Sequence, residues 1–264
     1  MSRPRRICGV RRTKSRSSFP APDPTESVLI GRVRPPVSRF PRRMPDAHTP
    51  ASLPRPFSSD WPRAARNAAQ TLWQWHAALV RPQTIGSNGT SDAVDAFFAE
   101  EQRRAAAGEP MRMVRERVWQ RAYDVCEAHN LDRAWLAKQV GAAQHLQGSV
   151  RFETNADLKA FVQAWAIPHG RLLGGLAEAN TTWQVRYLDE LARAFFHLGR
   201  LLTLPHDLSE GRLFLPLEDL RRNRVSVQQL RDGGVTEGVR KLLWKESIRI
   251  RDALAQGQPL QKEL

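Results

Sequence analysis

The stretch TLPHDLSEGRLFLP, residues 203–216, brings an aspartate and an arginine close together in the chain. The carboxylate of Asp207 can serve as an oxygen ligand for a hard divalent cation such as Mg²⁺. Familiar catalytic patterns are otherwise missing. The seven histidines form no His-Glu-x-x-His pair, and there is neither a Gly-x-Ser-x-Gly elbow nor a phosphate-binding glycine-rich loop. Whether Asp207 belongs to a metal site therefore depends on what the fold brings to it.

Most of the positive charge lies near the N-terminus. Of a net formal charge of +14, the residues after position 43 carry only +4, because 1–43 hold twelve Arg and Lys against Asp23 and Glu26. Twelve of the eighteen prolines lie at or before Pro62. Such a composition buries too little apolar surface to offset the entropy of ordering, so we expect 1–60 to be a disordered Arg/Pro-rich arm.

Three interpretations of this arm stay open. It can contact polyanions or anionic lipid, or it can be a targeting segment. The interpretation that we favour is a start at Met44, with the preceding residues mis-assigned. Since the body of the chain is only mildly basic, we expect no specific nucleic-acid partner.

The two cysteines, Cys8 and Cys126, exclude a disulfide framework and a cysteine-based zinc site. Cys126 lies in a helical pattern and is expected to be an apolar core residue. No apolar run approaches the roughly eighteen residues that span a bilayer. We expect a cytoplasmic protein, with peripheral membrane contact left open.

From residue 61 onward, apolar residues recur with a helical period. The clearest helices are expected at 111–130, 131–147, 158–179, 188–198 and 235–257. Asn130 is placed to cap the second of them, and Thr154 with Asp157 forms a Thr-x-x-Asp cap for the third. The small residues of LLGG, 172–175, indicate close helix packing. No stretch alternates at period two over more than four residues, so the pattern predicts one all-α domain over 61–264.

The order of several short motifs resembles the squalene/phytoene synthase family. SDAVD, 91–95, falls where that family has its first Asp-rich motif, Asp-Asp-x-x-Asp. In LAKQVGAAQH, 136–145, Gly141 and His145 stand where the family tends to have Gly and then Asp. RFETNADLKAF, 151–161, is similar to the family's Arg-Tyr and Glu-Leu segment.

Two further motifs complete the resemblance, which covers roughly 90–255. AIPHGRLL, 166–173, is similar to the Ala-Asn-Pro-Val-Gly-Arg segment of the hydroxysqualene synthase branch. DLSEGRLFLP, 207–216, fits Asp-x-x-x-Gly-Arg-x-Tyr-Leu-Pro, the second half of the second Asp-rich motif. Each motif alone is weak, but their order and spacing together are fairly specific.

The resemblance implies an isoprenoid-synthase-type helical bundle with a central apolar cavity. In that family, Asp-rich helices bind Mg²⁺, which holds the diphosphates of two prenyl substrates for head-to-head coupling. Carried over to this chain, the resemblance implies Asp92, Asp95 and Asp207 as metal ligands and Arg171 and Arg212 as diphosphate contacts. For each arginine, a role in helix packing or at the surface is an equally good interpretation.

The chain departs from the family at both Asp-rich motifs. Ser91 and Thr203 stand where the leading aspartates are expected, and His145 and His206 beside the motifs are expected not to be ligands. Pro205 disfavours a helical Leu204, so we expect a helix break there, with Thr203 and Asp207 on different faces.

Six aromatic residues lie on helical stripes that in the family border the prenyl tunnel: Trp119, Trp135, Phe161, Trp165, Phe195 and Phe196. Aromatic residues at this spacing are also common in an ordinary core, and the sequence does not separate the two interpretations.

Two functions remain in view. One is Mg²⁺-dependent prenyl transfer in squalene, hopanoid or carotenoid synthesis. The other, which we favour slightly, is a catalytically impaired family member that acts as a partner, assembly or lipid-binding protein, with a related synthase subunit as its candidate partner. A third, nucleic-acid binding, rests only on the arm.

Overall fold

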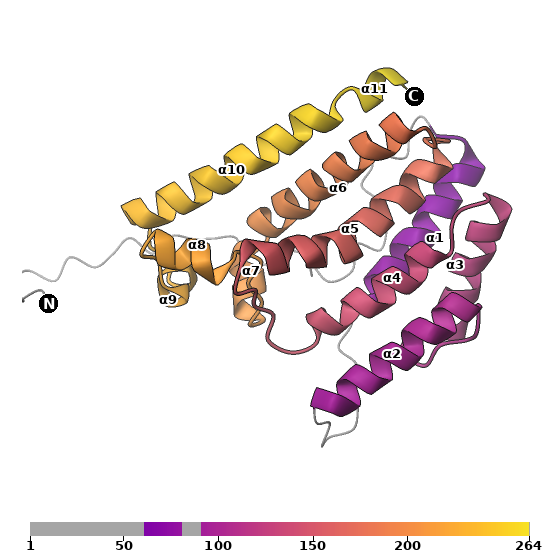
Figure 1. The fold of residues 1–264 in the computed structure, drawn as a ribbon, viewed down its shortest axis with the longest axis horizontal. Coiled ribbons are helices and arrows are strands. Elements are labelled where there is room, and N and C mark those ends of the chain that lie inside the picture. The colour runs from indigo at the N-terminus through magenta and orange to yellow at the C-terminus, as the bar shows by residue number, and fades with distance from the viewer. Residues whose placement is uncertain (1–60, 81–90, 264) are drawn as a thin grey trace, which may run out of the picture. The chain divides into compact units, whose positions relative to one another are not determined.

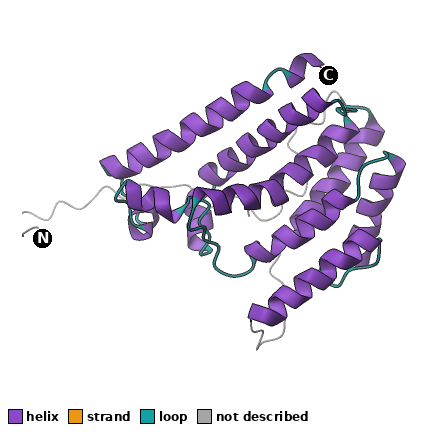
Figure 2. Cartoon of the chain, in the orientation of Figure 1, coloured by secondary structure: helices purple, strands orange, loops and turns teal. Residues whose placement is uncertain are grey.

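The computed structural model describes residues 61–80 and 91–263, in which every regular element is a helix (Figures 1 and 2). The helices are α1 (Arg63–Leu79), α2 (Ser91–Ala107), α3 (Glu116–Ala128), α4 (Ala134–Ala143), α5 (Asn155–Leu176), α6 (Thr182–Leu202), α7 (Leu204–Ser209), α8 (Leu217–Arg222), α9 (Val227–Arg231), α10 (Glu237–Gly257) and α11 (Leu260–Glu263), with a 3₁₀ turn at Gln144–Leu146. The predicted all-α domain is confirmed. The arm and the start at Met44 lie outside the described residues and stay predictions.

The long helices pack in a series that does not follow the chain order. Helix α10 packs on α6, α6 on α5, α5 on α4 and α4 on α2, while α1 packs against α3 and α5 (Figure 1). The main core contains Trp75 and Trp119, both almost fully buried. It also contains Cys126 as a fully buried free thiol, and burial raises the pKa of this thiol to about 12. The expected core role of Cys126 is confirmed.

Side-chain caps define where several helices begin. The Thr154 hydroxyl accepts a 3.2 Å hydrogen bond from the backbone N–H of Asp157, and the Asp157 carboxylate accepts one of 3.0 Å from the Thr154 N–H. This confirms the predicted cap of α5. The same arrangement opens α6 at Thr181 and α9 at Ser226. Each such cap satisfies two backbone donors that a helix start leaves unpaired.

The expected cap at Asn130 is wrong. Asn130 has a φ of 51° and lies just after the end of α3, where the N–H of Leu131 donates a 2.8 Å bond to the carbonyl of Cys126. Asparagine tolerates this left-handed conformation, so the residue ends one helix instead of starting the next. The side chain of Asp132 takes the other role and accepts a 2.8 Å bond from the N–H of Ala134.

Helices α5 and α6 approach each other closely because glycines face the contact. A Cβ atom on Gly170 would lie 2.7 Å from the Cβ of Ala192, and one on Gly174 would overlap the side chain of Leu188. The close packing predicted for residues 172–175 is therefore confirmed.

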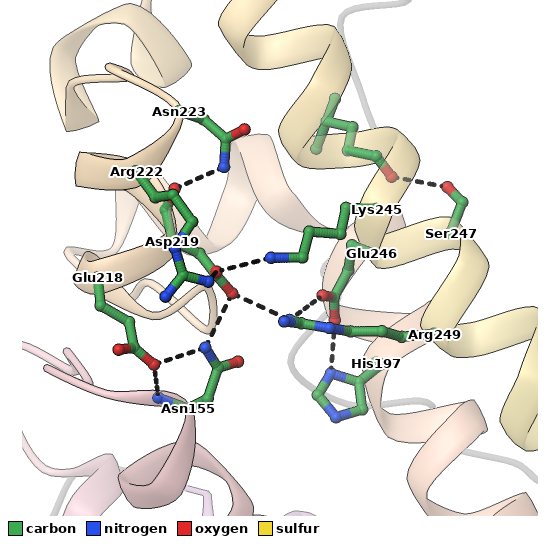
Figure 3. A network of polar contacts seen from close by, with 11 residues as sticks. Asn155, His197, Glu218, Asp219, Arg222, Asn223, Lys245, Glu246, Ser247 and Arg249 are labelled. Carbon is green, nitrogen blue, oxygen red and sulfur yellow. Dashed lines mark hydrogen bonds and ion pairs between the residues drawn. The ribbon is translucent and has the colours of Figure 1, made fainter.

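A buried polar network joins α8 to α10 (Figure 3). The carboxylate of Asp219 is 1% exposed and accepts bonds from Asn155 Nδ2 at 3.0 Å, Arg249 Nη1 at 3.0 Å and Lys245 Nζ at 3.2 Å. Burial opposes the charged form, but the bond from Asn155 and the charges of Arg249 and Lys245 outweigh it and lower the pKa of Asp219. Glu246 extends the network to α6 through a 2.8 Å contact with His197.

In the part of the chain that the structure describes, no helix combines the length and apolar character that crossing a bilayer requires.

Candidate ligand-binding site

Helices α1, α5 and α6 line a cavity of about 600 Å³. Its wall is mostly apolar and includes three of the aromatic residues that the sequence left ambiguous, Trp165, Phe195 and Phe196. The volume lies within the range of small-molecule sites, which are typically apolar with a few convergent polar groups. The predicted central cavity is confirmed.

The polar end of the cavity is centred on Asp207, which is 3% exposed. Its Oδ1 atom accepts a 3.1 Å bond from Nη1 of Arg200, and its Oδ2 atom accepts a 2.8 Å bond from the hydroxyl of Thr203. Both carboxylate oxygens are therefore already engaged by donors of the protein itself.

A helix break close to Pro205 is confirmed, but it falls at Thr203: Leu204, expected to be non-helical, is the first residue of α7. The expected separation of Thr203 and Asp207 onto different faces is also wrong. Helix α6 ends at Leu202, and α7 starts at Leu204 with Pro205 in its first turn, where a missing N–H costs nothing. Only Thr203 separates the two helices, so α7 follows α6 almost without interruption. The N–H of Asp207 donates a 2.9 Å bond to the Thr203 carbonyl, and the two side chains meet.

Two arginines face this end of the cavity. Arg212 is 7% exposed, and its Nε has no hydrogen-bond partner among the described residues. The guanidinium of Arg200 lies 5.3 Å from the ring centroid of Phe214. Burial and the charge of Arg212 lower the pKa of Arg200, against the opposing effect of Asp207. With two cations and one carboxylate, this end of the cavity has an excess of positive charge.

Asp92 and Asp95 lie outside the cavity lining. Both are exposed near the start of α2, which packs against α4, and neither lines the cavity. The side chain of Asp95 accepts a hydrogen bond from Gln144. The structure does not bring these two carboxylates to Asp207, and their assignment as metal ligands stays a prediction.

Arg171 ties α5 to α6. Its Nε and Nη2 atoms donate to the two carboxylate oxygens of Asp189 at 2.8 and 2.7 Å, and its guanidinium lies over the ring of Trp135. This paired geometry raises the pKa of Arg171. It does not line the cavity, so only one of the two predicted diphosphate contacts, Arg212, lies at the cavity end.

The cavity lining does not fit a magnesium cluster. Magnesium prefers a near-octahedral shell of oxygen atoms. Among the described lining residues, Asp207 is the one carboxylate, and the described part of the chain has no group of three or more His, Cys, Asp or Glu side chains that could hold a metal ion. His206 lines the cavity, whereas His145 is exposed beside Phe161. No step through Mg²⁺ can be built from these residues.

Two histidines that line the cavity were not selected from the sequence. His76 on α1 and His169 on α5 stack with ring centroids 4.2 Å apart. Burial lowers the pKa of His169 to about 4, and burial together with the charge of nearby Arg200 and His169 lowers that of His76 well below its usual value. Both rings are therefore neutral at neutral pH. Their separation in the chain left no spacing signal by which to find them.

Comparisons with known proteins agree with this architecture. The family model described as squalene/phytoene synthase matches residues 59–264. The phytoene synthase of Thermus thermophilus is 30% identical over 191 residues, which are 69% of this chain and 61% of that protein. The matched region thus spans less than two thirds of that relative's length.

Two crystal structures share the fold. The squalene synthase HpnC from Alicyclobacillus acidocaldarius superposes with a TM-score of 0.61 at 23% identity, covering 77% of this chain and 75% of that one. A dehydrosqualene synthase in complex with a ligand gives 0.58 at 15% identity, covering 74% and 67%. The fold is that of an isoprenoid-synthase helical domain. The chain belongs to the squalene/phytoene synthase family of isoprenoid biosynthesis.

Proposed function

We propose that this family member binds a single isoprenoid amphiphile, with its hydrocarbon chain in the cavity and its anionic head group against Arg200 and Arg212, and that it does not couple two prenyl diphosphates. The observation that carries the proposal is the state of Asp207. It is the one carboxylate among the described lining residues, and both of its oxygens already accept bonds from Arg200 and Thr203.

The two arginines supply a direct mode of head-group binding. A guanidinium group matches the oxygens of phosphate in charge and in geometry, and it needs no bridging metal. Arg212 is suited to this role because it lines the cavity end while being only 7% exposed. Asp207 offsets the charge of one guanidinium, which leaves a net positive charge for one anionic group.

Coupling of two diphosphates makes a larger electrostatic demand. Holding and ionising such groups requires several cationic charges in fixed positions, which metal ions supply in phosphoryl and diphosphate sites. One engaged carboxylate does not assemble those ions. The geometry therefore favours the lipid-binding interpretation over head-to-head transfer. The related synthase partner and the peripheral membrane contact stay predictions.

Calorimetric titration of the full-length chain tests the proposal. The ligand is a farnesyl diphosphate analogue whose C–S linkage blocks ionisation, added with Mg²⁺ or with EDTA. We expect binding in EDTA that Mg²⁺ does not tighten, and an affinity about 10- to 100-fold lower in Arg212→Gln, because a hydrogen bond to a charged group is lost. Arg251→Gln, which removes an exposed arginine on α10, is the control and should bind as the wild type does.

The opposite result is equally clear. Binding that requires Mg²⁺ and disappears in Asp207→Ala, together with a coupled product from farnesyl or geranylgeranyl diphosphate, would establish prenyl transfer instead and refute the proposal.

A further inference from the structure

The cavity runs lengthwise along α6. The lining residues of this helix recur with the helical period from Leu188 to Thr203, so they share one face of it. Helix α5 runs antiparallel to α6, because Gly170 lies against Ala192 whereas Gly174 lies against Leu188. The cavity therefore extends from its polar end, near Thr203, to a far end at Leu188.

Two lining leucines stand at the far end, and each is held by a glycine of a neighbouring helix. A Cβ atom on Gly174 of α5 would lie 2.2 Å from Cδ1 of Leu188, and one on Gly257 of α10 would lie 2.5 Å from Cγ of Leu191. Each leucine thus packs directly on helix backbone and has no room to move toward that helix. Shortly after Gly257, the buried side chain of Leu260 lines the cavity as well. A ligand that reaches these leucines can displace them toward α5 or α10 only by moving a helix.

The distance between the two ends limits the length of a ligand. Leu188 and Arg200 are twelve residues apart on α6, and a helix rises about 1.5 Å per residue, so the depth is about 18 Å. An extended hydrocarbon chain advances by about 1.25 Å per carbon–carbon bond, the projection of a bond of about 1.5 Å. About 14 carbons therefore span the depth when the head group lies beside Arg200. Most of the lining between the ends is apolar and suits such a chain, including Trp165, Leu173 and Phe196.

We infer that Leu188 and Leu191 form an end wall that limits the hydrocarbon chain of the bound amphiphile to a main chain of about 14 carbons. The inference rests on the proposed function, because it requires an anionic head group at Arg200 and Arg212. Within this limit, every added methylene group is buried in the cavity and raises the affinity about fourfold. A longer chain has to fold back or leave carbons in water, so the additional carbons give no further gain.

Titration with alkyl phosphates of graded length tests the inference. The probes are decyl, dodecyl, tetradecyl, hexadecyl and octadecyl phosphate, each kept below its critical micelle concentration and titrated into the full-length chain. Leu188→Ala and Leu191→Ala each remove a side chain of the end wall, and circular dichroism checks that they fold. The two variants are independent of each other, so the test stands if one of them does not fold.

Leu146→Ala is the matched control, because it removes the same atoms from the cavity lining near the polar end. Leu146 follows His145 in the chain, the ring of His145 contacts that of Phe161, and Phe161 contacts Phe214 at the polar end. This substitution should weaken the binding of every probe and leave the chain length at which the gain in affinity stops unchanged.

In the wild type, we expect the affinity to rise about fourfold per methylene group up to tetradecyl phosphate and then to stay level. In Leu188→Ala and in Leu191→Ala, the limit should move by about two carbons. Hexadecyl phosphate should then bind about tenfold more tightly than tetradecyl phosphate, because two more methylene groups are buried.

The remaining outcomes separate the end wall from the proposed function. If the probes bind through Arg212 but the affinity keeps rising to octadecyl phosphate in the wild type, the end wall is refuted and the lipid-binding function stands. The same follows if neither leucine variant moves the limit, or if Leu146→Ala moves it equally. If no probe binds, or if all bind equally well to Arg212→Gln, the proposed function fails and the end wall fails with it.

Discussion

The hydroxyl of Thr203 donates a 2.8 Å hydrogen bond to Oδ2 of Asp207. The same hydroxyl also lies 2.9 Å from the carbonyl of Gly199, which is an alternative acceptor for its one hydrogen. The family resemblance leads us to expect an aspartate at position 203. The chain has Thr203 there instead, and its hydroxyl donates to the carboxylate of Asp207. The hydrogen bond between Thr203 and Asp207 thus links the end of α6 to α7 at the polar end of the cavity.

The hydrogen bond between Thr203 and Asp207 is expected to contribute to the free energy of unfolding. Thr203→Val should lower the free energy of unfolding by about 1–2 kcal/mol, because a buried carboxylate loses one donor. Urea unfolding followed by circular dichroism measures the change. Thr182→Val, at an exposed position in the first turn of the same helix, is the control and should change the free energy by less than about 0.5 kcal/mol. Equal effects of the two substitutions would mean that the bond to Asp207 adds nothing.

The close approach of α5 and α6 predicts opposite effects for two glycine substitutions. Gly170→Ala should lower the free energy of unfolding by about 1–3 kcal/mol, since the new methyl group would meet the Cβ of Ala192 at 2.7 Å. Gly199→Ala should raise it by about 0.5–1 kcal/mol, because this position in α6 has open space and alanine favours the helix. Thermal unfolding of the two variants decides the matter. Destabilisation by both would show that α6 is more tightly packed near Gly199 than the structure indicates.

The buried network around Asp219 predicts sensitivity to acid. The folded-state pKa of Asp219 is lowered, so its contribution to stability is complete above the ordinary pKa of about 4 and is lost as the pH falls below it. Asp219→Asn should lower the free energy of unfolding at neutral pH by about 2–3 kcal/mol. That value is less than for a fully buried pair, because Lys245 and Arg249 are partly exposed.

Urea midpoints measured from neutral pH to below about pH 4 test this relation. The acid-induced loss should be smaller in Asp219→Asn than in the wild type. Asp252→Asn removes the carboxylate of an exposed pair on α10 and should follow the wild type at every pH. If Asp219→Asn lost as much stability in acid as the wild type, Asp219 would not be a source of the acid sensitivity.

The cavity histidine predicts a second, separate pH dependence. The pKa of His169 is about 4 in the folded chain and about 6.5 when unfolded, so the unfolded chain binds the extra proton between these values. Stability should therefore fall as the pH drops from about 6.5 to 4, by up to about 1.4 kcal/mol per pH unit. His76 acts in the same direction because its pKa is also lowered.

His169→Phe should reduce this slope to the part that His76 contributes, and it should leave the loss of stability below about pH 4 unchanged. Trp73→Phe alters a ring whose centroid lies 5.6 Å from that of His169 without removing a titrating group, so it should keep the slope. A wild-type stability that is level between about pH 4 and 6.5 would show that the ring of His169 is hydrated in the folded chain.

Local sequence was sufficient for the helical class and for most of the long helices, although the helix expected from residue 111 begins at Glu116. The helical period of apolar residues, the cap at Thr154 and the small residues before Ala177 each depend on neighbours within a turn or two, and each is confirmed. The break near Pro205 is also found, but at Thr203 and with Leu204 helical.

Such reasoning failed at two places. Asn130 ends α3 instead of capping the next helix, and the side chains of Thr203 and Asp207 meet instead of lying on different faces. Side-chain type and spacing do not distinguish a residue that ends one helix from a residue that starts the next.

The site was decided by the tertiary structure. Periodicity tells which residues share a face of a helix, but it does not tell what that face meets. For this reason Asp92 and Asp95 matched a motif yet lie on a helix that does not line the cavity, whereas His76 and His169, far apart in the chain, meet within it. Asp207 was visible in the sequence, but its engagement by Arg200 and Thr203 required the chain to turn at the end of α6. The sequence determined the helices and the family resemblance, and packing decided which groups remain free to bind a ligand.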